Sequence, residues 1–335
     1  MIQTIKLQEL QIPENRRLFG AGATTHVLAW SETVPNYAGW SRCLHPAVKP
    51  SFTRDYRQGR IHIHTCWSGV QDPRVQTWSG FDVALAYTTL HVPPTAPERY
   101  YVCQNLTVRP HRTLLIDQLN QRDLLSRGRV SYGYRREPQP GNNGRNTPPR
   151  HWGNLVESAW IEEETDAYQL PSPVDIPPPP VRVWSNTAFN IITETHHDDQ
   201  TKAGVLWTEK TWQVIWLRRP FVICGQPGAN TQLLDRGYRL LEGVDDWTWD
   251  LEKDQYRRVR ALVHCVHRLC NRYTPAELHE MNRPVVEHNR RHLIESFLSE
   301  GLPEIVWEST RTDTPGAAEV CEYLQRVYDA IRGEL

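Results

Sequence analysis

The sequence predicts an α/β protein, and three segments lead to this prediction. Residues 189–193 (FNIIT) are a short apolar run with β-branched side chains, which is typical of a buried strand. Apolar residues at helical spacing follow Thr208, and a second short apolar run follows at 220–225 (PFVICG). From residue 254 to residue 300 the pattern is largely helical. Strands that alternate with helices favour a sheet covered by helices.

The first part of the chain, residues 1–98, predicts a small α/β unit. Its candidate strands are 3–10, 26–30, 61–66 and 82–88. Gly20, Gly22 and Thr24 suggest a phosphate-binding loop, but the third glycine of such a loop is missing. A plain turn is therefore the simpler interpretation of this segment.

A second domain is predicted over residues 99–312. It opens with a strand at 100–106 (YYVCQNL), a helix that begins at Pro110 and ends at Gly128, and a further strand in 130–134 (VSYGY). Residues 171–180 have the composition of a polyproline linker and run up to an expected strand at 181–184 (VRVW). The basic, Pro/Gly/Asn-rich segment 134–153 is expected to be a loop. It is either an inert connection or a lid that contacts an acceptor.

Helix starts are clear at two further points. Thr208 occupies an N-cap position, with Glu209 and Lys210 in the first turn. Residues 274–277 (TPAE) have the pattern of a capping box with proline at the first helical position. A last helix is expected at 315–332, within a C-terminal segment of residues 313–335.

Composition excludes several classes of protein. The 335 residues include no apolar run of the roughly 20 residues that cross a bilayer, so a soluble, cytoplasmic protein is expected. The seven cysteines are scattered and odd in number, which argues against a disulfide framework or a zinc site. The net charge of −1 argues against a surface that coats nucleic acid. Arginine outnumbers lysine 33 to 5, which reflects either phosphate recognition or a GC-rich coding sequence.

Polar residues gather where ligands bind in open α/β sheets. Such ligands lie outside the carboxyl ends of the strands, beside helix N-termini. Glu194 follows one expected strand, and Glu209 and Lys210 begin the next helix. A lysine at a helix start suits a diphosphate, and a carboxylate suits ribose hydroxyls. The segment therefore predicts a nucleotide site.

The same segment, FNIITET…WTEKTWQVIWLRRPFVICGQPG, resembles the α1,3-fucosyltransferase family of inverting glycosyltransferases and its phage and bacterial relatives. The family has a strand-borne FEN motif, then YVTEK, then a strand that ends in Gly. The resemblance implies that Glu194 replaces the FEN glutamate, that Glu209 binds ribose and that Lys210 binds the diphosphate. The Asn of FEN is Thr195 here, and the Tyr of YVTEK is Leu206. Further donor contacts would come from Thr208, Trp207 and Gly225.

Two more segments extend the resemblance over roughly residues 61–228. In NLTVRPHRTLLIDQL, Arg112 falls on the phosphate-contacting arginine of the family, with Arg109 close by; a surface arginine in a basic turn is the alternative. In the segment that contains SGFDVALAY, Asp72-Pro73 stands ten residues before Asp82, where the family has its catalytic glutamate. The resemblance thus makes Asp72 the expected general base, with a turn-forming Asp as the alternative.

The implied fold is GT-B, with two Rossmann-like domains that face each other across a cleft and a helical C-terminal region that returns to the first domain. The implied reaction transfers a sugar from a GDP-fucose-like donor to a hydroxyl acceptor with inversion. No cofactor or metal is obligatory, and no membrane partner is expected. A bacterial or phage-infected cell would be the location.

Two other functions stay open. One is a non-catalytic binding module on a degenerate glycosyltransferase scaffold; the other is a phage-type glycosyltransferase that acts on modified DNA bases. Acidic and histidine clusters also permit a metal site, although solvated loops and packed histidines are the simpler interpretations. These clusters are His62 with His64, residues 196–199 (HHDD), and Asp245 with Asp246. Asp246 and Asp250 form a D-x-x-x-D pattern that also occurs in the phage relatives and has no role derivable from sequence.

Overall fold

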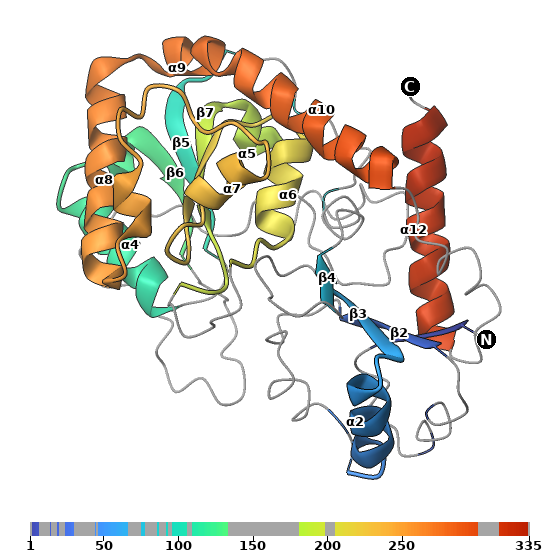
Figure 1. Cartoon of the computed structure of the whole chain (residues 1–335). Helices are drawn as coiled ribbons and strands as arrows, with labels where there is room; N and C mark the ends of the chain where they lie inside the picture. The colour runs from blue at the N-terminus through green and yellow to red at the C-terminus, as the bar shows by residue number, and fades with distance from the viewer. Residues whose placement is uncertain are drawn as a thin grey trace, which may run out of the picture.

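The computed structural model of the chain describes residues 2–6, 14, 19, 24–29, 44, 46–65, 75–77, 86, 92, 96–105, 109–132, 181–197, 205–300 and 315–333. Two separate four-stranded parallel sheets organise these residues. Figure 1 shows the second sheet enclosed by helices and the first sheet beside the C-terminal helix. The fold is therefore α/β with parallel sheets, as the sequence predicts.

The first sheet is built from the N-terminal part of the chain. Its strands are β1 (Ile2–Lys6), β2 (Thr24–Ala29), β3 (Ile61–Thr65) and β4 (Val75–Thr77), in that order. Helix α2 (Lys49–Arg57) precedes β3 and buries Phe52 and Tyr56. Val27 and Ile63 are register partners on β2 and β3, and both are buried. This sheet thus has an apolar face of its own.

The second sheet has the order β6-β5-β7-β8. Its strands are β5 (Arg99–Cys103), β6 (Gly128–Val130), β7 (Thr187–Thr193) and β8 (Phe221–Cys224). Every residue of β7 and β8 is buried, as expected for parallel strands covered on both faces. The β7 and β8 segments are the two apolar runs that the sequence identifies, and both predictions are confirmed.

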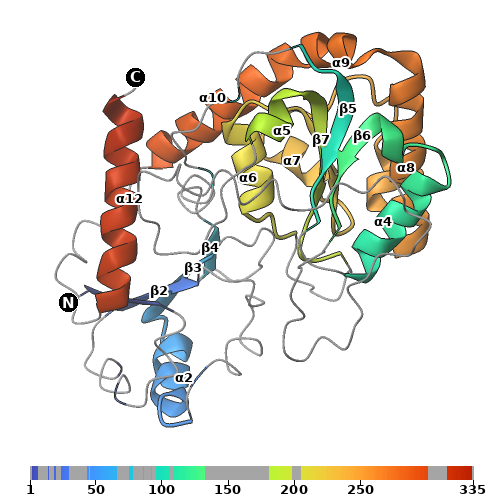
Figure 2. The same ribbon diagram turned by 180° about the vertical axis from the view of Figure 1, so that it is seen from behind.

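Helices cover both faces of the second sheet. Figures 1 and 2 show α4 (Pro110–Asn120) and α8 (Gln255–Arg272) on one side, and α6 (Glu209–Trp216) and α10 (Arg283–Glu300) on the other. Short elements join them: η3 (Leu125–Arg127), α5 (Val181–Ser185), α7 (Thr231–Asp235), η5 (Thr248–Leu251) and α9 (Pro275–Met281). The capping box of Thr274 and Glu277 is present at the start of α9, as predicted.

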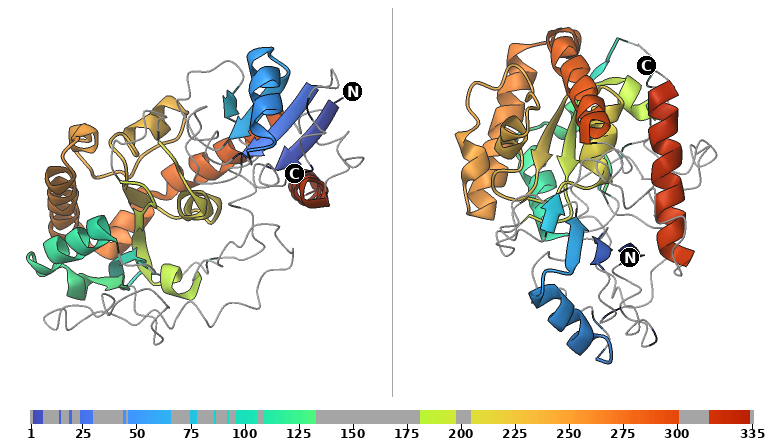
Figure 3. Two further views of the ribbon diagram at one scale, coloured as in Figure 1. Left: turned by 90° about the horizontal axis from the view of Figure 1, so that it is seen from below. Right: turned by 45° about the vertical axis from the view of Figure 1, so that its right-hand side comes forward.

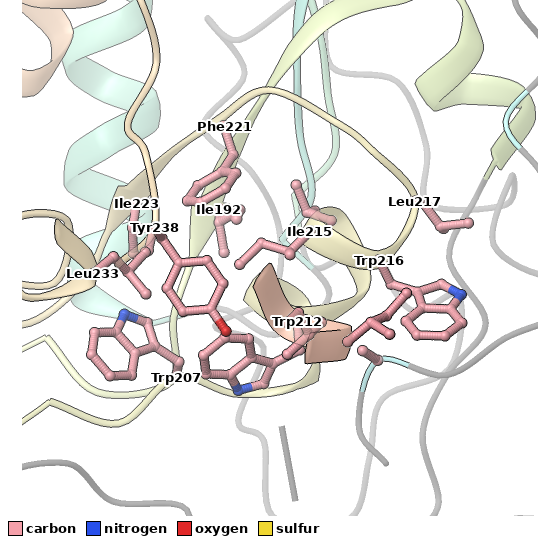
Figure 4. Close-up of a cluster of buried hydrophobic side chains, with 14 of the residues drawn as sticks. Ile192, Trp207, Trp212, Ile215, Trp216, Leu217, Phe221, Ile223, Leu233 and Tyr238 are labelled. Atoms are coloured by element: carbon pink, nitrogen blue, oxygen red, sulfur yellow. The ribbon is translucent and has the colours of Figure 1, made fainter. Parts of the chain in front are cut away.

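Each face of the second sheet has its own apolar core. On the α6 side the core is aromatic, with Trp207, Trp212 and Tyr238 packed together (Figure 4). The ring centroids of Trp212 lie 5.9 Å from Trp207 and 5.8 Å from Tyr238. On the α4 and α8 side the core is mainly aliphatic, with Leu119 and Val263 fully buried. Burying these large side chains holds α6 and α4 rigidly against the sheet.

The C-terminal helix α12 (Pro315–Gly333) lies beside β1 and α10 (Figure 3). Its apolar side chains Leu324, Val327 and Ile331 are buried. The rings of Phe297 on α10 and Tyr328 on α12 meet edge to face at 5.5 Å. A helix from the end of the chain is thereby held next to the first strand. The division into domains 1–98, 99–312 and 313–335 stays a prediction, although β5 does begin at Arg99.

Several sequence predictions are wrong in detail. Residues 181–184 are expected to be a strand, but they form the helical turn α5. That turn places Trp184 in the core, where its indole donates to Gln104 Oε1 at 3.1 Å, so tertiary packing overrides β propensity. Ala86, within the expected strand 82–88, is helical, and the rest of that segment lies outside the described residues. The helix predicted from Pro110 to Gly128 ends at Asn120, and η3 follows.

Candidate functional site

The carboxyl ends of β5, β7 and β8 meet at one edge of the second sheet, because these strands are parallel. Helices α4 and α6 begin at this edge, after the loops that leave β5 and β7. The first turn of α8 is tied to the same edge, since Arg258 Nε donates to the carbonyl of Gly225, directly after β8, at 3.2 Å. We call this region the carboxyl edge.

Glu194 is the residue around which the carboxyl edge is assembled. Its side chain is buried, with 1% exposure. Its carboxylate accepts hydrogen bonds from Thr208 N at 3.0 Å, Thr208 Oγ1 at 2.6 Å and Thr211 Oγ1 at 2.6 Å. All three donors belong to the start of α6. Glu194 therefore fixes the N-terminus of α6 to the end of β7 and leaves little of its carboxylate for a ligand.

The first turn of α6 presents a lysine and a glutamate at the surface of this edge. Thr208 is the N-cap and accepts from Lys210 N, as predicted. Lys210 Nζ lies 2.7 Å from Glu209 Oε1 and 3.0 Å from Thr208 Oγ1. The two side chains are 32% and 21% exposed, respectively, so both are accessible to a ligand. A partly exposed pair of this kind is held less strongly than a buried one, and an anion can compete with Glu209 for the ammonium.

The start of α4 adds two arginines, one half-buried and one buried. Arg109 Nη1 donates to the Thr195 carbonyl at 3.0 Å, and Arg112 Nη2 donates to the Thr193 carbonyl at 3.2 Å. Arg112 is only 4% exposed. Burial, and then repulsion from Arg109, lowers the pKa of Arg112 from its ordinary value. Arginine remains protonated even so, and positive charge is concentrated beside Glu194.

Two histidines stack inside the carboxyl edge. The rings of His111 and His197 lie 4.7 Å apart and nearly parallel. His111 Nε2 lies 3.1 Å from the carbonyl of Glu194, so it is the donor in that hydrogen bond. Burial, and then the charge of Arg112, lowers the pKa of His111 to about 3. Burial, and then the neighbouring His111 and Arg258, lowers the pKa of His197 to about 2. Both imidazoles are therefore neutral at ordinary pH.

The thiols beside these histidines are not reactive groups. Cys224 Sγ lies 3.5 Å from His197 Nε2. Burial raises the pKa of Cys224 and of Cys103 to about 12, so both stay protonated. The sequence interpretation of Cys103, Cys224, Cys265 and Cys270 as buried thiols is confirmed.

Asp250 has a structural role that sequence reasoning missed. Its buried carboxylate accepts from the backbone and side chain of both Asn230 and Thr231, at distances from 2.8 to 3.1 Å. This set of bonds holds the turn between β8 and α7. Asp246, four residues earlier, accepts from the backbone N–H of Thr248, the first residue of η5, at 2.8 Å. The D-x-x-x-D pattern therefore organises a loop.

The other predicted donor residues are placed as follows. Trp207 is fully buried, and its indole donates to the Ala229 carbonyl at 2.9 Å. Gly225 sits at the end of β8, where an added Cβ would lie 3.1 to 3.5 Å from Ile223, Ala229 and Glu194. Glycine thus keeps the end of β8 close to Glu194. Asp72, Asp82 and the loop 134–153 lie outside the described residues.

The candidate metal clusters do not form a metal site within the part of the chain that the structure describes, where no group of at least three ligating side chains is found. Asp245 pairs instead with Arg268 and Arg272, at 3.5 and 3.1 Å. His196 and His197 are described, whereas Asp198 and Asp199 are not. On the first sheet, parallel register places His26 beside His62.

Arg258, His111 and His197 are the site residues that sequence reasoning did not identify. Arg258 lies in the run QYRRVR, where nothing distinguishes it from Arg257 and Arg260. His197 is noticed in the sequence only as one of the HHDD cluster. Their proximity depends on contacts between residues far apart in the chain, such as the 61 positions between His197 and Arg258.

Comparison with family models, with curated proteins and with solved structures finds no match to this chain. Within the described ranges, no helix combines the length and the apolar composition needed to cross a membrane.

Proposed function

We propose that the carboxyl edge binds the diphosphate of a sugar nucleotide, and that the chain is a glycosyltransferase with a GDP-fucose-like donor. The observation that carries the proposal is the arrangement of cations at this edge. Lys210 and Arg109 are accessible from solvent, while Arg112 lies buried behind them. The three groups are anchored on one short segment, 193–195, directly or through Thr208.

This arrangement suits a diphosphate leaving group. Backbone N–H groups at the starts of α4 and α6, together with fixed cations, stabilise the charge that develops as the sugar departs. Glu209 is half-buried beside Lys210 and would accept hydrogen bonds from ribose hydroxyls. Glu194 contributes by holding Thr208, and thus Lys210, in place. The general base would come from elsewhere, and Asp72 is the candidate that the resemblance supplies.

Nucleotide binding provides the first test. Unfolding temperature is measured with GDP, UDP, ADP or CDP added. A ligand at 100 times its Kd stabilises the native state by about 2.7 kcal/mol, which raises Tm by several degrees. Lys210→Ala should remove most of this shift, because a charge-assisted hydrogen bond contributes about 1.5–3 kcal/mol. Lys49→Ala makes the same charge change at an exposed position of α2 and should leave the shift unchanged.

Turnover provides the second test. Release of nucleoside diphosphate from GDP-fucose and other sugar nucleotides is followed with glycans or with hydroxymethylated DNA as acceptor. Transfer of the sugar to either acceptor supports the proposal that the chain is a glycosyltransferase. If the protein binds nucleotide but transfers sugar with no pair of donor and acceptor, the non-catalytic binding module is favoured. If no nucleotide changes the Tm, the proposal of a donor site is contradicted.

A further inference from the structure

Arg258 is a buried residue whose guanidinium reaches three separate loops. It is 2% exposed, although it belongs to the first turn of α8. Its Nε donates to the Gly225 carbonyl at 3.2 Å. Its Nη2 lies 3.0 Å from His197 Nδ1 and 2.5 Å from the His197 carbonyl. Its Nη1 donates to the carbonyls of Glu252 and of Lys253, the latter at 3.3 Å.

The hydrogen bond to His197 determines the tautomer of that imidazole. Since a guanidinium only donates, Nδ1 of His197 must be the acceptor. The proton of the neutral ring is then on Nε2, which faces Cys224 Sγ at 3.5 Å. Arg258 therefore fixes both the position and the protonation pattern of His197, and the ring in turn packs flat against His111.

The loop that Arg258 holds follows directly on the residues that the arginines of the proposed anion site contact, since Arg109 donates to the Thr195 carbonyl and Arg112 to the carbonyl of Thr193 at the end of β7. His197 is two residues after Thr195, whose carbonyl accepts from Arg109. His111, the stacking partner of His197, is adjacent to Arg112 in α4 and donates to the Glu194 carbonyl. A shift of His197 would move the acceptors of Arg109 and of His111 together.

The charge of Arg258 is also not neutralised by direct pairing. Among the ion pairs of the described residues, none includes Arg258, and all of its hydrogen bonds go to carbonyls and one neutral ring. The carboxylates of Asp250, Glu252 and Asp254 act on this charge electrostatically, without a direct ion pair. A buried positive charge whose hydrogen bonds go only to dipoles attracts a nearby anion more strongly than an exposed one.

We propose that Arg258 is a positioning residue of the anion site: through His197 it holds the segment 194–197, and thereby Arg109 and Arg112, in the arrangement that receives a diphosphate. This inference rests on the proposed function. Arg258 itself does not touch the ligand, because its donors are already occupied by protein acceptors.

The experiment compares Arg258→Met and Arg258→Lys with Arg260→Met. Arg260 is an exposed arginine two residues further along the same helix, so its variant removes the same charge without touching the loops. The probe is whichever of GDP, UDP, ADP and CDP raises the Tm of the wild-type protein most, and its Kd is measured by titration calorimetry. Arg258→Met should weaken binding by about tenfold or more, and Arg260→Met should stay within about twofold.

Arg258→Lys tests whether a positive charge alone at this position maintains nucleotide binding. A lysine keeps the positive charge but loses the planar guanidinium. The nucleotide affinity of Arg258→Lys should therefore lie between those of Arg258→Met and the wild-type protein. The ¹⁵N signals of the His197 imidazole give a second readout. They should report a single Nε2–H tautomer in the wild-type protein and in Arg260→Met, and a mixture in Arg258→Met.

The possible outcomes distinguish a failure of this inference from a failure of the proposed function. If the wild-type protein binds none of the four nucleotides, the proposed function and this inference both fail. If it binds one and Arg258→Met binds it equally well, only the inference is overturned. Should Arg258→Met not fold, His197→Phe replaces it, since phenylalanine keeps a ring against His111 but loses both nitrogens. Wild-type affinity in His197→Phe would overturn the inference as well.

Discussion

Glu194 and Thr208 are joined by two hydrogen bonds, with Glu194 Oε1 accepting from Thr208 N at 3.0 Å and Oε2 accepting from Thr208 Oγ1 at 2.6 Å. One carboxylate thus caps a helix whose N-cap residue lies 14 residues later in the chain. Because Thr208 is itself the N-cap of α6, the position of Lys210 depends on a residue at the end of β7. The glutamate implied by the resemblance as a donor contact acts in this structure as a support for the residues that follow it.

Replacing Glu194 with glutamine should destabilise the fold strongly. The amide would face three hydroxyl and amide donors with only one acceptor oxygen, and hydrogen bonds to a buried charged group contribute about 1.5–3 kcal/mol each. We expect the free energy of unfolding to fall by about 2–4 kcal/mol, measured by urea denaturation. Glu295→Gln changes the same group at an exposed position of α10 and should have almost no effect. Equal stabilities of the two variants would contradict the capping role.

The stacked histidines should make the protein less stable in mild acid. Histidines of the unfolded chain titrate near pH 6.5, whereas the native pKa values are about 3 for His111 and about 2 for His197. As pH falls below about 6.5, the unfolded state binds protons that the native state does not. Stability is therefore lost as pH falls toward the native pKa values, by about 2 kcal/mol for each histidine between about pH 7.5 and about pH 5.

Denaturation curves at several pH values, compared between variants, isolate this effect from that of the carboxylates. In His111→Gln an amide can still donate to the Glu194 carbonyl, but one titrating group is gone. Its loss of stability between about pH 7.5 and about pH 5 should be smaller than that of the wild-type protein by about 2 kcal/mol. His267→Gln, at a half-buried position of α8, should lose as much stability as the wild-type protein. An unchanged pH dependence in His111→Gln would show that His111 is protonated in the native state.

Asp72→Asn should separate catalysis from nucleotide binding. If Asp72 is the general base, turnover should fall by about 10²–10⁴-fold while the Kd for nucleoside diphosphate is unchanged, since the proposed site for that ligand is the carboxyl edge of the second sheet. Asp82→Asn is the matched variant ten residues later and should affect stability more than turnover. Near wild-type turnover in Asp72→Asn would place the base elsewhere. Glu98, which is exposed directly before β5, would then be the next residue to replace.

Nucleotide affinity should not depend on a divalent ion. In the proposed site, Lys210, Arg109 and Arg112 would supply the positive charge that faces the diphosphate, so no added cation would be needed to neutralise it. The Kd measured in EDTA should agree within about twofold with that measured in magnesium. A Kd that rises at least tenfold in EDTA would instead indicate a metal-bridged diphosphate, with Asp198 and Asp199 as the first residues to replace.

The local features of the site could be predicted from the sequence because they depend on neighbours in the chain. The buried strands β7 and β8 follow from short apolar runs, and the start of α6 follows from Thr208 and the first-turn residues Glu209 and Lys210. The start of α9 follows from the four residues of its capping box. In each case the hydrogen bond or the periodic contact spans only a few residues.

Tertiary structure alone decided how these features are assembled. The segment 181–184 is rich in β-branched residues, yet burial of Trp184 makes it a helical turn. Asp250 belongs to a D-x-x-x-D pattern in the sequence, but its role depends on Asn230 and Thr231, about 20 residues away, which donate hydrogen bonds to its carboxylate. Arg258 reaches His197 across 61 residues. These contacts form only when the sheet brings distant loops to one edge, where burial removes water and leaves each polar group dependent on a protein partner.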